Sequence, residues 1–143
     1  MSKLLLSLIL LISGQSVFAH AFLETSTPEN GATVDAPEQL VLTFGEAVET
    51  MFSVFELHPV DVPEDADSDA LAAIANGLMT THFNLGLDSV IETTLVTEDQ
   101  NAEVVLELPP LEPGAYALMW RILSVDTHTS QDFITFVVQA STE

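Results

Sequence analysis

Three residues near opposite ends of the chain carry groups that together suit a metal ion. Asp126 and His128 lie two apart in "SVDTHTS", and in an extended chain such residues leave the same face with Cα atoms about 6.6 Å apart. His20 follows an apolar leader. A histidine at a free N-terminus offers its α-amino group and its ring Nδ1, which close a six-membered chelate. The spacing therefore predicts that Asp126 and His128 can reach one ion, and His20 adds two possible donors.

An amine, two imidazoles and one carboxylate form a set of three nitrogens and one oxygen. Such a set suits tetragonal Cu(II) better than soft Cu(I), and Cu(II) stands highest in the divalent affinity series. A proton competes for the amine, whose unperturbed pKa is about 7.7 to 8.0, so binding should weaken as the pH falls. Each feature alone has a plainer interpretation: His20 as an accident of a cleavage site, and the Asp-x-His triplet as an ordinary turn. From the residues alone, these interpretations stay open.

The first residues have the three parts of a secretory signal peptide. Lys3 supplies positive charge, "LLLSLILLI" is a short apolar run, and Val17 with Ala19 places small residues at the −3 and −1 positions of a cleavage site. The run of about ten residues is well short of the roughly 20 that a transmembrane helix needs. We therefore expect residues 1–19 to be removed after Ala19. Residues 20–143 would then form one periplasmic domain that has no membrane insertion.

The chain is strongly acidic, with 22 Asp and Glu against two Lys and Arg and a formal net charge of −20. Beyond residue 19, Arg121 is the only lysine or arginine. Such a surface is a poor partner for nucleic acid or anionic lipid. The acidity can be interpreted as a field that gathers cations or as an adaptation for solubility. Since the chain has no cysteine, its stability must come from packing without disulfides.

The dominant hydrophobic period is two, which is typical of β-strands. Alternating or β-branched stretches occur at 38–44, 51–57 and 102–108, and runs that are apolar at nearly every position follow at 115–125 and 133–138. Runs of the second kind are typical of strands covered on both faces. The pattern predicts an all-β sandwich of about seven strands.

One segment, at 61–78, departs from the strand pattern. It opens with acidic residues and continues as a short helix, with Asp67 or Ser68 as the N-cap and Asn76-Gly77 as its stop. Its acids lack the spacing and the glycine of a calcium-binding loop. We expect a helical insertion between two strands, and the sequence assigns it no role.

Two long motifs resemble the CopC family of periplasmic copper-resistance proteins. They are "HAFLETSTPENGATVDAPEQLVLTFGEAVE" at 20–49 and "PGAYALMWRILSVDTHTSQDFITFVV" at 113–138. The resemblance implies an Ig-like Greek-key β-sandwich with a mononuclear Cu(II) site, one ion per chain. It assigns the metal to the amine and imidazole of His20, to Asp126 and to His128.

The chain departs from the family pattern in two respects. Thr127 stands where members usually have glycine, a residue that suits tight turns. The methionine-rich Cu(I) site of some members has no counterpart, because the methionines here are scattered. His58 and His82 are either ordinary surface or partly buried histidines, or weak additional copper ligands.

Two functions from different classes are consistent with these residues. The first is a monomeric carrier or buffer, not an enzyme, that passes copper to an inner-membrane copper importer or another copper-resistance protein. The second is an oxidative enzyme similar to lytic polysaccharide monooxygenases, which also bind copper through an N-terminal histidine. That chemistry needs an open coordination position, which Asp126 beside His128 would close. We therefore expect the carrier.

Overall fold

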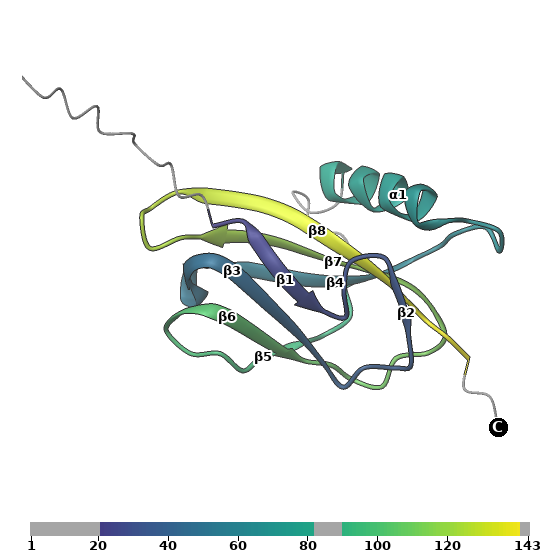
Figure 1. Ribbon diagram of the computed structural model, residues 1–143, viewed down its shortest axis with the longest axis horizontal. Coiled ribbons are helices and arrows are strands. Elements are labelled where there is room, and N and C mark those ends of the chain that lie inside the picture. The colour runs from purple at the N-terminus through teal and green to yellow at the C-terminus, as the bar shows by residue number, and fades with distance from the viewer. Residues whose placement is uncertain (1–20, 82–89, 141–143) are drawn as a thin grey trace, which may run out of the picture.

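The computed structural model describes residues 21–81 and 90–140, which form two packed β-sheets and one α-helix (Figure 1). The strand orders are β1-β3-β6-β5 in the first sheet and β2-β8-β7-β4 in the second. The predicted all-β sandwich is confirmed, with eight strands in the described part of the chain. His20 and the predicted signal peptide lie outside the described residues. The elements are β1 (Leu23–Thr27), β2 (Ala32–Val34), β3 (Gln39–Glu49), the 3-10 helix η1 (Thr50–Phe52), β4 (Val54–Val60), α1 (Ser68–Thr81), β5 (Thr94–Leu95), β6 (Gln100–Glu107), β7 (Gly114–Leu123) and β8 (Thr129–Val138).

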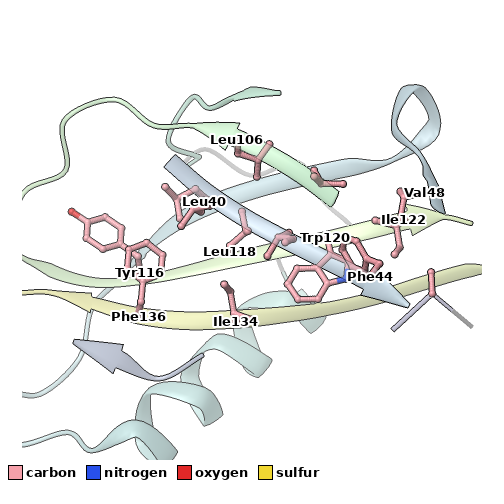
Figure 2. Packing of buried hydrophobic residues seen from close by; sticks show 14 of the residues in the cluster. Leu40, Phe44, Val48, Leu106, Tyr116, Leu118, Trp120, Ile122, Ile134 and Phe136 are labelled. Carbon is pink, nitrogen blue, oxygen red and sulfur yellow. The ribbon is translucent and has the colours of Figure 1, made fainter. Parts of the chain in front are cut away.

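The main core fills the space between the two sheets (Figure 2). Leu118, Trp120 and Ile122 of β7 point into it. The Trp120 ring meets Phe44 of β3 edge to face, with ring centroids 5.9 Å apart. Edge-to-face aromatic pairs add to the stabilisation that comes from buried area alone. This contact therefore ties the first sheet to the second.

Helix α1 covers the outer face of the second sheet, which explains why β7 is apolar on both faces. Leu71 and Ala75 of the helix are buried in a second cluster with Ala117 and Met119 of β7. Because the core lies on one side of β7 and the helix on the other, residues 115–120 are all buried. The sequence assigned no role to the insertion at 61–78, and its helix thus completes the packing of the second sheet.

The helix is longer than the sequence predicts. Its predicted N-cap is confirmed, because Asp67 Oδ1 accepts a hydrogen bond of 2.8 Å from the Ala70 N–H. The predicted stop at Asn76-Gly77 is wrong, since the helix runs on for another turn. An internal glycine costs about 1 kcal/mol relative to alanine, but the following turn packs Leu78 against the second cluster. That packing favours continuation of the helix.

The strand predicted at 51–57 begins later than expected, because η1 occupies its first residues. The Thr50 hydroxyl donates a hydrogen bond of 2.6 Å to the Asp99 carbonyl. The Ser53 hydroxyl donates one of 2.8 Å to the Glu49 carbonyl. Side-chain bonds of this kind offer the backbone an alternative to the strand ladder. The two hydroxyl residues therefore favour a turn where the apolar pattern predicted a strand.

The pairing of β3 changes near its end. The β3–β6 register shifts within 43–48. In that stretch the Gly45 N–H donates to the Phe22 carbonyl at 2.9 Å, and the Ala47 carbonyl accepts from the Val125 N–H at 3.1 Å. Such irregularities redirect a strand away from its sheet neighbour. Here β3 turns toward the N-terminal segment and the β7–β8 connection, the two segments that adjoin or contain the predicted ligands.

Replacing Gly77 with alanine should stabilise the protein. Gly77 is exposed within α1, and a Cβ at this position would meet no atom within 4 Å. We expect the free energy of unfolding in urea to rise by roughly 0.5–1 kcal/mol, the usual preference for alanine in a helix. Gly31→Ala is the matched control and should destabilise, because Gly31 has φ +80°. A loss of stability in Gly77→Ala would instead support a helix that stops at this glycine.

Candidate metal centre

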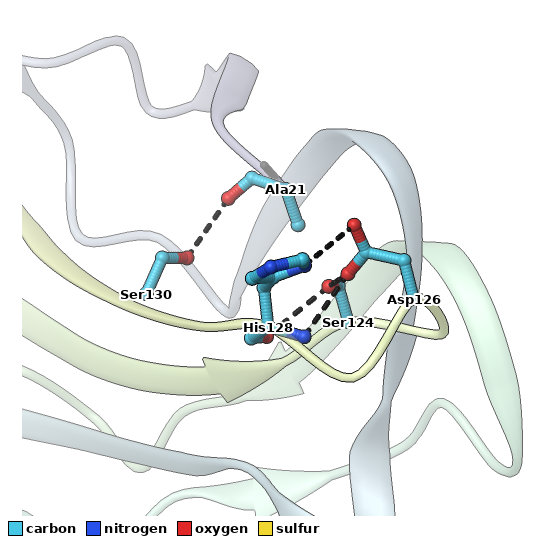
Figure 3. A network of polar contacts seen from close by, with 5 residues as sticks. All are labelled: Ala21, Ser124, Asp126, His128 and Ser130. Carbon is cyan, nitrogen blue, oxygen red and sulfur yellow. Dashed lines mark hydrogen bonds and ion pairs between the residues drawn. The ribbon is translucent and has the colours of Figure 1, made fainter. Parts of the chain in front are cut away.

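Asp126 and His128 lie side by side in the turn between β7 and β8 (Figure 3). Asp126 Oδ2 is 2.9 Å from His128 Nδ1. The side chains are 32% and 50% exposed, respectively, so the pair is open to an incoming ion. The structure therefore brings together two of the three predicted ligand residues. The third, His20, lies outside the described residues.

Ser124, which is buried beside the end of β7, organises this turn. Its hydroxyl donates a hydrogen bond to Asp126 Oδ1, and its N–H donates one of 2.9 Å to the His128 carbonyl. The same Asp126 Oδ1 accepts a bond of 3.0 Å from the His128 N–H. An aspartate that accepts from the backbone two residues on forms an Asx turn. The turn fixes the direction of both candidate ligands.

The hydrogen bonds lower the pKa of Asp126 from 3.8 to about 2. The largest cause is the Ser124 hydroxyl, followed by the His128 N–H, because bonds donated to a carboxylate favour its charged form. An ionised carboxylate can only accept hydrogen bonds, so His128 Nδ1 must carry the proton shared with Asp126. That tautomer leaves the ring lone pair on Nε2, and metal-binding histidines commonly donate their other N–H to a carboxylate in this way.

The carboxylate of Asp126 retains capacity for a metal bond. Oδ1 accepts from the Ser124 hydroxyl and the His128 N–H, whereas Oδ2 accepts from His128 Nδ1. Each carboxylate oxygen has about two lone-pair sites. With respect to these bonds, Oδ2 has a site left for an ion. Because Oδ2 lies on the Nδ1 side of the ring, Asp126 can orient an imidazole that binds metal through Nε2, or it can bind the same ion as Nδ1 once that nitrogen has lost its proton, but it cannot share one ion with Nε2.

Thr127 has φ +75°, a left-handed backbone conformation that β-branched residues rarely adopt. Its N–H donates a bond of 2.9 Å to the Ser124 carbonyl, which closes the turn. Such conformations cost on the order of 1–3 kcal/mol and persist where the surroundings determine them. The turn thus keeps a shape that suits glycine although threonine occupies the position.

The residue that follows His20 is fixed next to this turn. Ala21 is buried, at 3% exposure. Its carbonyl accepts a hydrogen bond of 3.0 Å from the hydroxyl of Ser130, two residues beyond His128 (Figure 3). Ala21, the first described residue, therefore lies at the same end of the sandwich as the β7–β8 turn.

The other histidines do not join the pair within the described residues. His58 is buried on β4, and its Nε2 lies 3.1 Å from Glu56 Oε2; His82 lies outside the described residues. Across residues 21–81 and 90–140, no three His, Cys, Asp or Glu side chains come close enough to hold a metal. A complete metal site would need donors in addition to the His, Cys, Asp and Glu side chains of the described residues.

The sequence analysis did not select Glu46, which lies in the irregular stretch of β3. Its Oε1 is buried and has no hydrogen-bond partner in the described part of the chain. A buried polar atom without a partner is costly, so a cation or a donor at this end of the sandwich would stabilise it. The sequence signal that could have identified Glu46 is its place within the "TFGEAVE" motif, which forms part of the family pattern.

These features define a class: a small two-sheet β-sandwich with an aspartate–histidine pair at one end. A family model described as the CopC domain matches residues 23–139. The chain belongs to the CopC family, as its motifs predict, and to the copper-resistance proteins that the family comprises.

Similar proteins support this assignment. Copper resistance protein C of Xanthomonas campestris pv. juglandis is 28% identical over 128 residues, which cover 90% of this chain and 87% of that protein. Protein YobA of Escherichia coli strain K12 is 30% identical over 125 residues, covering 87% and 82% respectively.

Two solved structures share the fold. PcoC, a copper resistance protein from Escherichia coli, has a TM-score of 0.60 and 24% identity over 82% of this chain and 99% of that chain. CopC from Methylosinus trichosporium OB3b has a TM-score of 0.62 and 21% identity over 87% and 98%. At these identities the comparison establishes the β-sandwich alone.

Replacing Ser124 with alanine should raise the pKa of Asp126 from about 2 toward 3.8, because it removes the largest cause of the lowered value. A lowered folded-state pKa stabilises the protein above pH 3.8, and this contribution is lost as the pH falls through about 2. The variant should therefore lose part of that stabilisation at every pH above 3.8. A carbon-13 NMR titration of the Asp126 carboxyl measures the pKa, with exposed Thr129→Ala as control. An unchanged pKa in Ser124→Ala would contradict the role given to this hydroxyl.

Proposed function

We propose that the protein is a periplasmic Cu(II) carrier that holds one ion between its mature N-terminus and the β7–β8 turn. The donors would be the His20 amine and Nδ1, Asp126 Oδ2 and His128 Nδ1, the last two being 2.9 Å apart, a spacing that suits adjacent ligands of one ion once the metal replaces the Nδ1 proton. The observation that carries the proposal is that Ala21, the residue bonded to His20, is hydrogen-bonded to the strand that begins next to His128. This contact supports a role for the adjoining residue 20 as a ligand beside the turn.

Covalent geometry supports this role. Consecutive Cα atoms are about 3.8 Å apart, and two residues of a strand span about 6.6 Å. The Ala21 carbonyl is bonded to Ser130, which is two residues from His128. These short spans are consistent with a ligand at position 20 reaching the turn.

The donor set suits the ion. Three nitrogens and one carboxylate favour tetragonal Cu(II), and Asp126 remains an anion because its pKa is about 2. Four protein donors would fill the equatorial plane. This arrangement supports carriage or buffering over the oxidative enzyme, which needs an open position for its substrate oxygen. Relatives named copper resistance protein C also favour handling of copper.

The proposed location depends on the leader. Cleavage after Ala19 would create the free amine that the chelate requires, and export would place the protein in the periplasm. No helix in the described residues is long and apolar enough to span a membrane. We propose that the loaded protein acts as a monomer and delivers copper to a membrane importer or another resistance protein.

Cu(II) titration of the protein that begins at His20 tests the proposal. We expect one tight equivalent per chain, with an axial, nitrogen-rich electron paramagnetic resonance spectrum. His20→Ala, Asp126→Asn and His128→Ala should each weaken binding by more than about 100-fold, since loss of even a supporting residue around a metal costs about 10–100-fold.

Matched controls separate this site from general acidity and from the other histidines. Asp132→Asn removes an exposed carboxylate from the same strand as Ser130, and His58→Gln removes the buried histidine of β4. Both should bind copper as the parent does. Equal losses in all five variants, or only weak uptake at many sites, would contradict the assignment.

A further inference from the structure

We propose that the N-terminal segment is clamped to both sheets, and that Ser130 and Gly45 are positioning residues for the copper chelate. The inference rests on the proposed function, because it concerns how the His20 donors would be held. It adds two residues that touch neither the proposed ligands' donor atoms nor the ion. Three observations carry it.

The first tether joins the segment to the second sheet. The Ser130 hydroxyl donates a hydrogen bond of 3.0 Å to the Ala21 carbonyl. Ser130 pairs with Ile122 of β7, which is fully buried, and it shares the strand face of the buried residues Ile134 and Phe136 because it is an even number of positions from them. Ser130 is itself half-buried, and the pairing with Ile122 holds its hydroxyl near the end of the core.

The second tether joins the segment to the first sheet. The Gly45 N–H donates a bond of 2.9 Å to the Phe22 carbonyl. The Phe22 ring lies so close to Gly45 that a Cβ there would be 3.0 Å from ring Cε1 and 3.1 Å from Cζ. These distances are shorter than ordinary van der Waals contact. Gly45 thus allows the ring to lie against β3, and a Cβ there would require the exposed ring to shift by a few tenths of an ångström.

The third tether is burial of the residue between these contacts and His20. Ala21 is 3% exposed and belongs to the main core. Its carbonyl is held by β8, and the next carbonyl, that of Phe22, is held by β3. Consecutive peptide groups are therefore fixed to opposite sheets. The segment crosses the end of the sandwich and cannot swing away from the β7–β8 turn without breaking one of these contacts.

This clamp would hold the N-terminal segment in place before metal binds. A ligand on a free terminus loses conformational entropy when it binds, and fixing it beforehand lowers that cost. The clamp should therefore slow copper release and raise affinity without changing the donor atoms. Its loss should leave the coordination spectrum of the bound ion intact.

The experiment compares Ser130→Ala and Gly45→Ala with the parent, all beginning at His20. Competition with a chelator gives the Cu(II) affinity, stopped-flow transfer to excess chelator gives the release rate, and electron paramagnetic resonance reports the donor set. We expect each variant to bind about tenfold more weakly, as for other supporting residues, with faster release and an unchanged spectrum. Ser130→Thr keeps the hydroxyl and should restore affinity. Thr129→Ala, on the same strand, is the control without effect.

A copper-free measurement tests the clamp independently. Amide hydrogen exchange at position 45, whose N–H donates to the Phe22 carbonyl, should accelerate in Ser130→Ala and Gly45→Ala but not in Thr129→Ala. If the parent fails to bind copper, the proposed function fails, and the exchange data still judge the clamp. If the parent binds tightly and both variants match it in affinity, release and exchange, the clamp is wrong.

Discussion

The hydrogen bond from the Ser124 hydroxyl to Asp126 is the contact on which the candidate site depends. Ser124 is buried beside the end of β7, so the packed sandwich fixes one oxygen of the Asp126 carboxylate. The other oxygen then faces His128 Nδ1. This bond is the largest cause of the lowered pKa of the carboxylate and fixes its orientation, which places Oδ2 against Nδ1 of His128. A rigid core thus imposes order on a turn that is itself exposed to solvent.

Strand β3 contacts both the N-terminal segment and the β7–β8 connection. The register shift in β3 frees Gly45 and Ala47 to bond the N-terminal segment and the β7–β8 connection. Both segments meet at one end of the sandwich, whereas α1 covers the outer face of the second sheet. The acidic insertion thus has a structural role in packing, and the proposed copper site lies at the end that holds the β7–β8 turn.

The sequence predicts the architecture well because alternation and continuous apolar runs are local signals. It also identifies Asp126 and His128 as neighbours, but for the wrong reason: the prediction assumed an extended chain, whereas the two residues lie in an Asx turn with Thr127 at φ +75°. The roles of Ser130 and Gly45 could not be predicted, since they depend on the pairing of Ser130 with Ile122 and on the irregular register of β3. The helix stop at Gly77 was misjudged for a related reason: the packing of the next turn on a distant strand outweighed a local preference.

The most direct test of the central claim is acetylation of the α-amino group. Lys3 is the only lysine of the chain and precedes residue 20, so an amine-selective reagent modifies only the terminus of the protein that begins at His20. The account predicts that acetylation weakens Cu(II) binding by orders of magnitude and removes one nitrogen from the resonance spectrum, while the circular dichroism spectrum is unchanged. Equal affinity and an identical spectrum after acetylation would show that the N-terminal amine does not hold the ion.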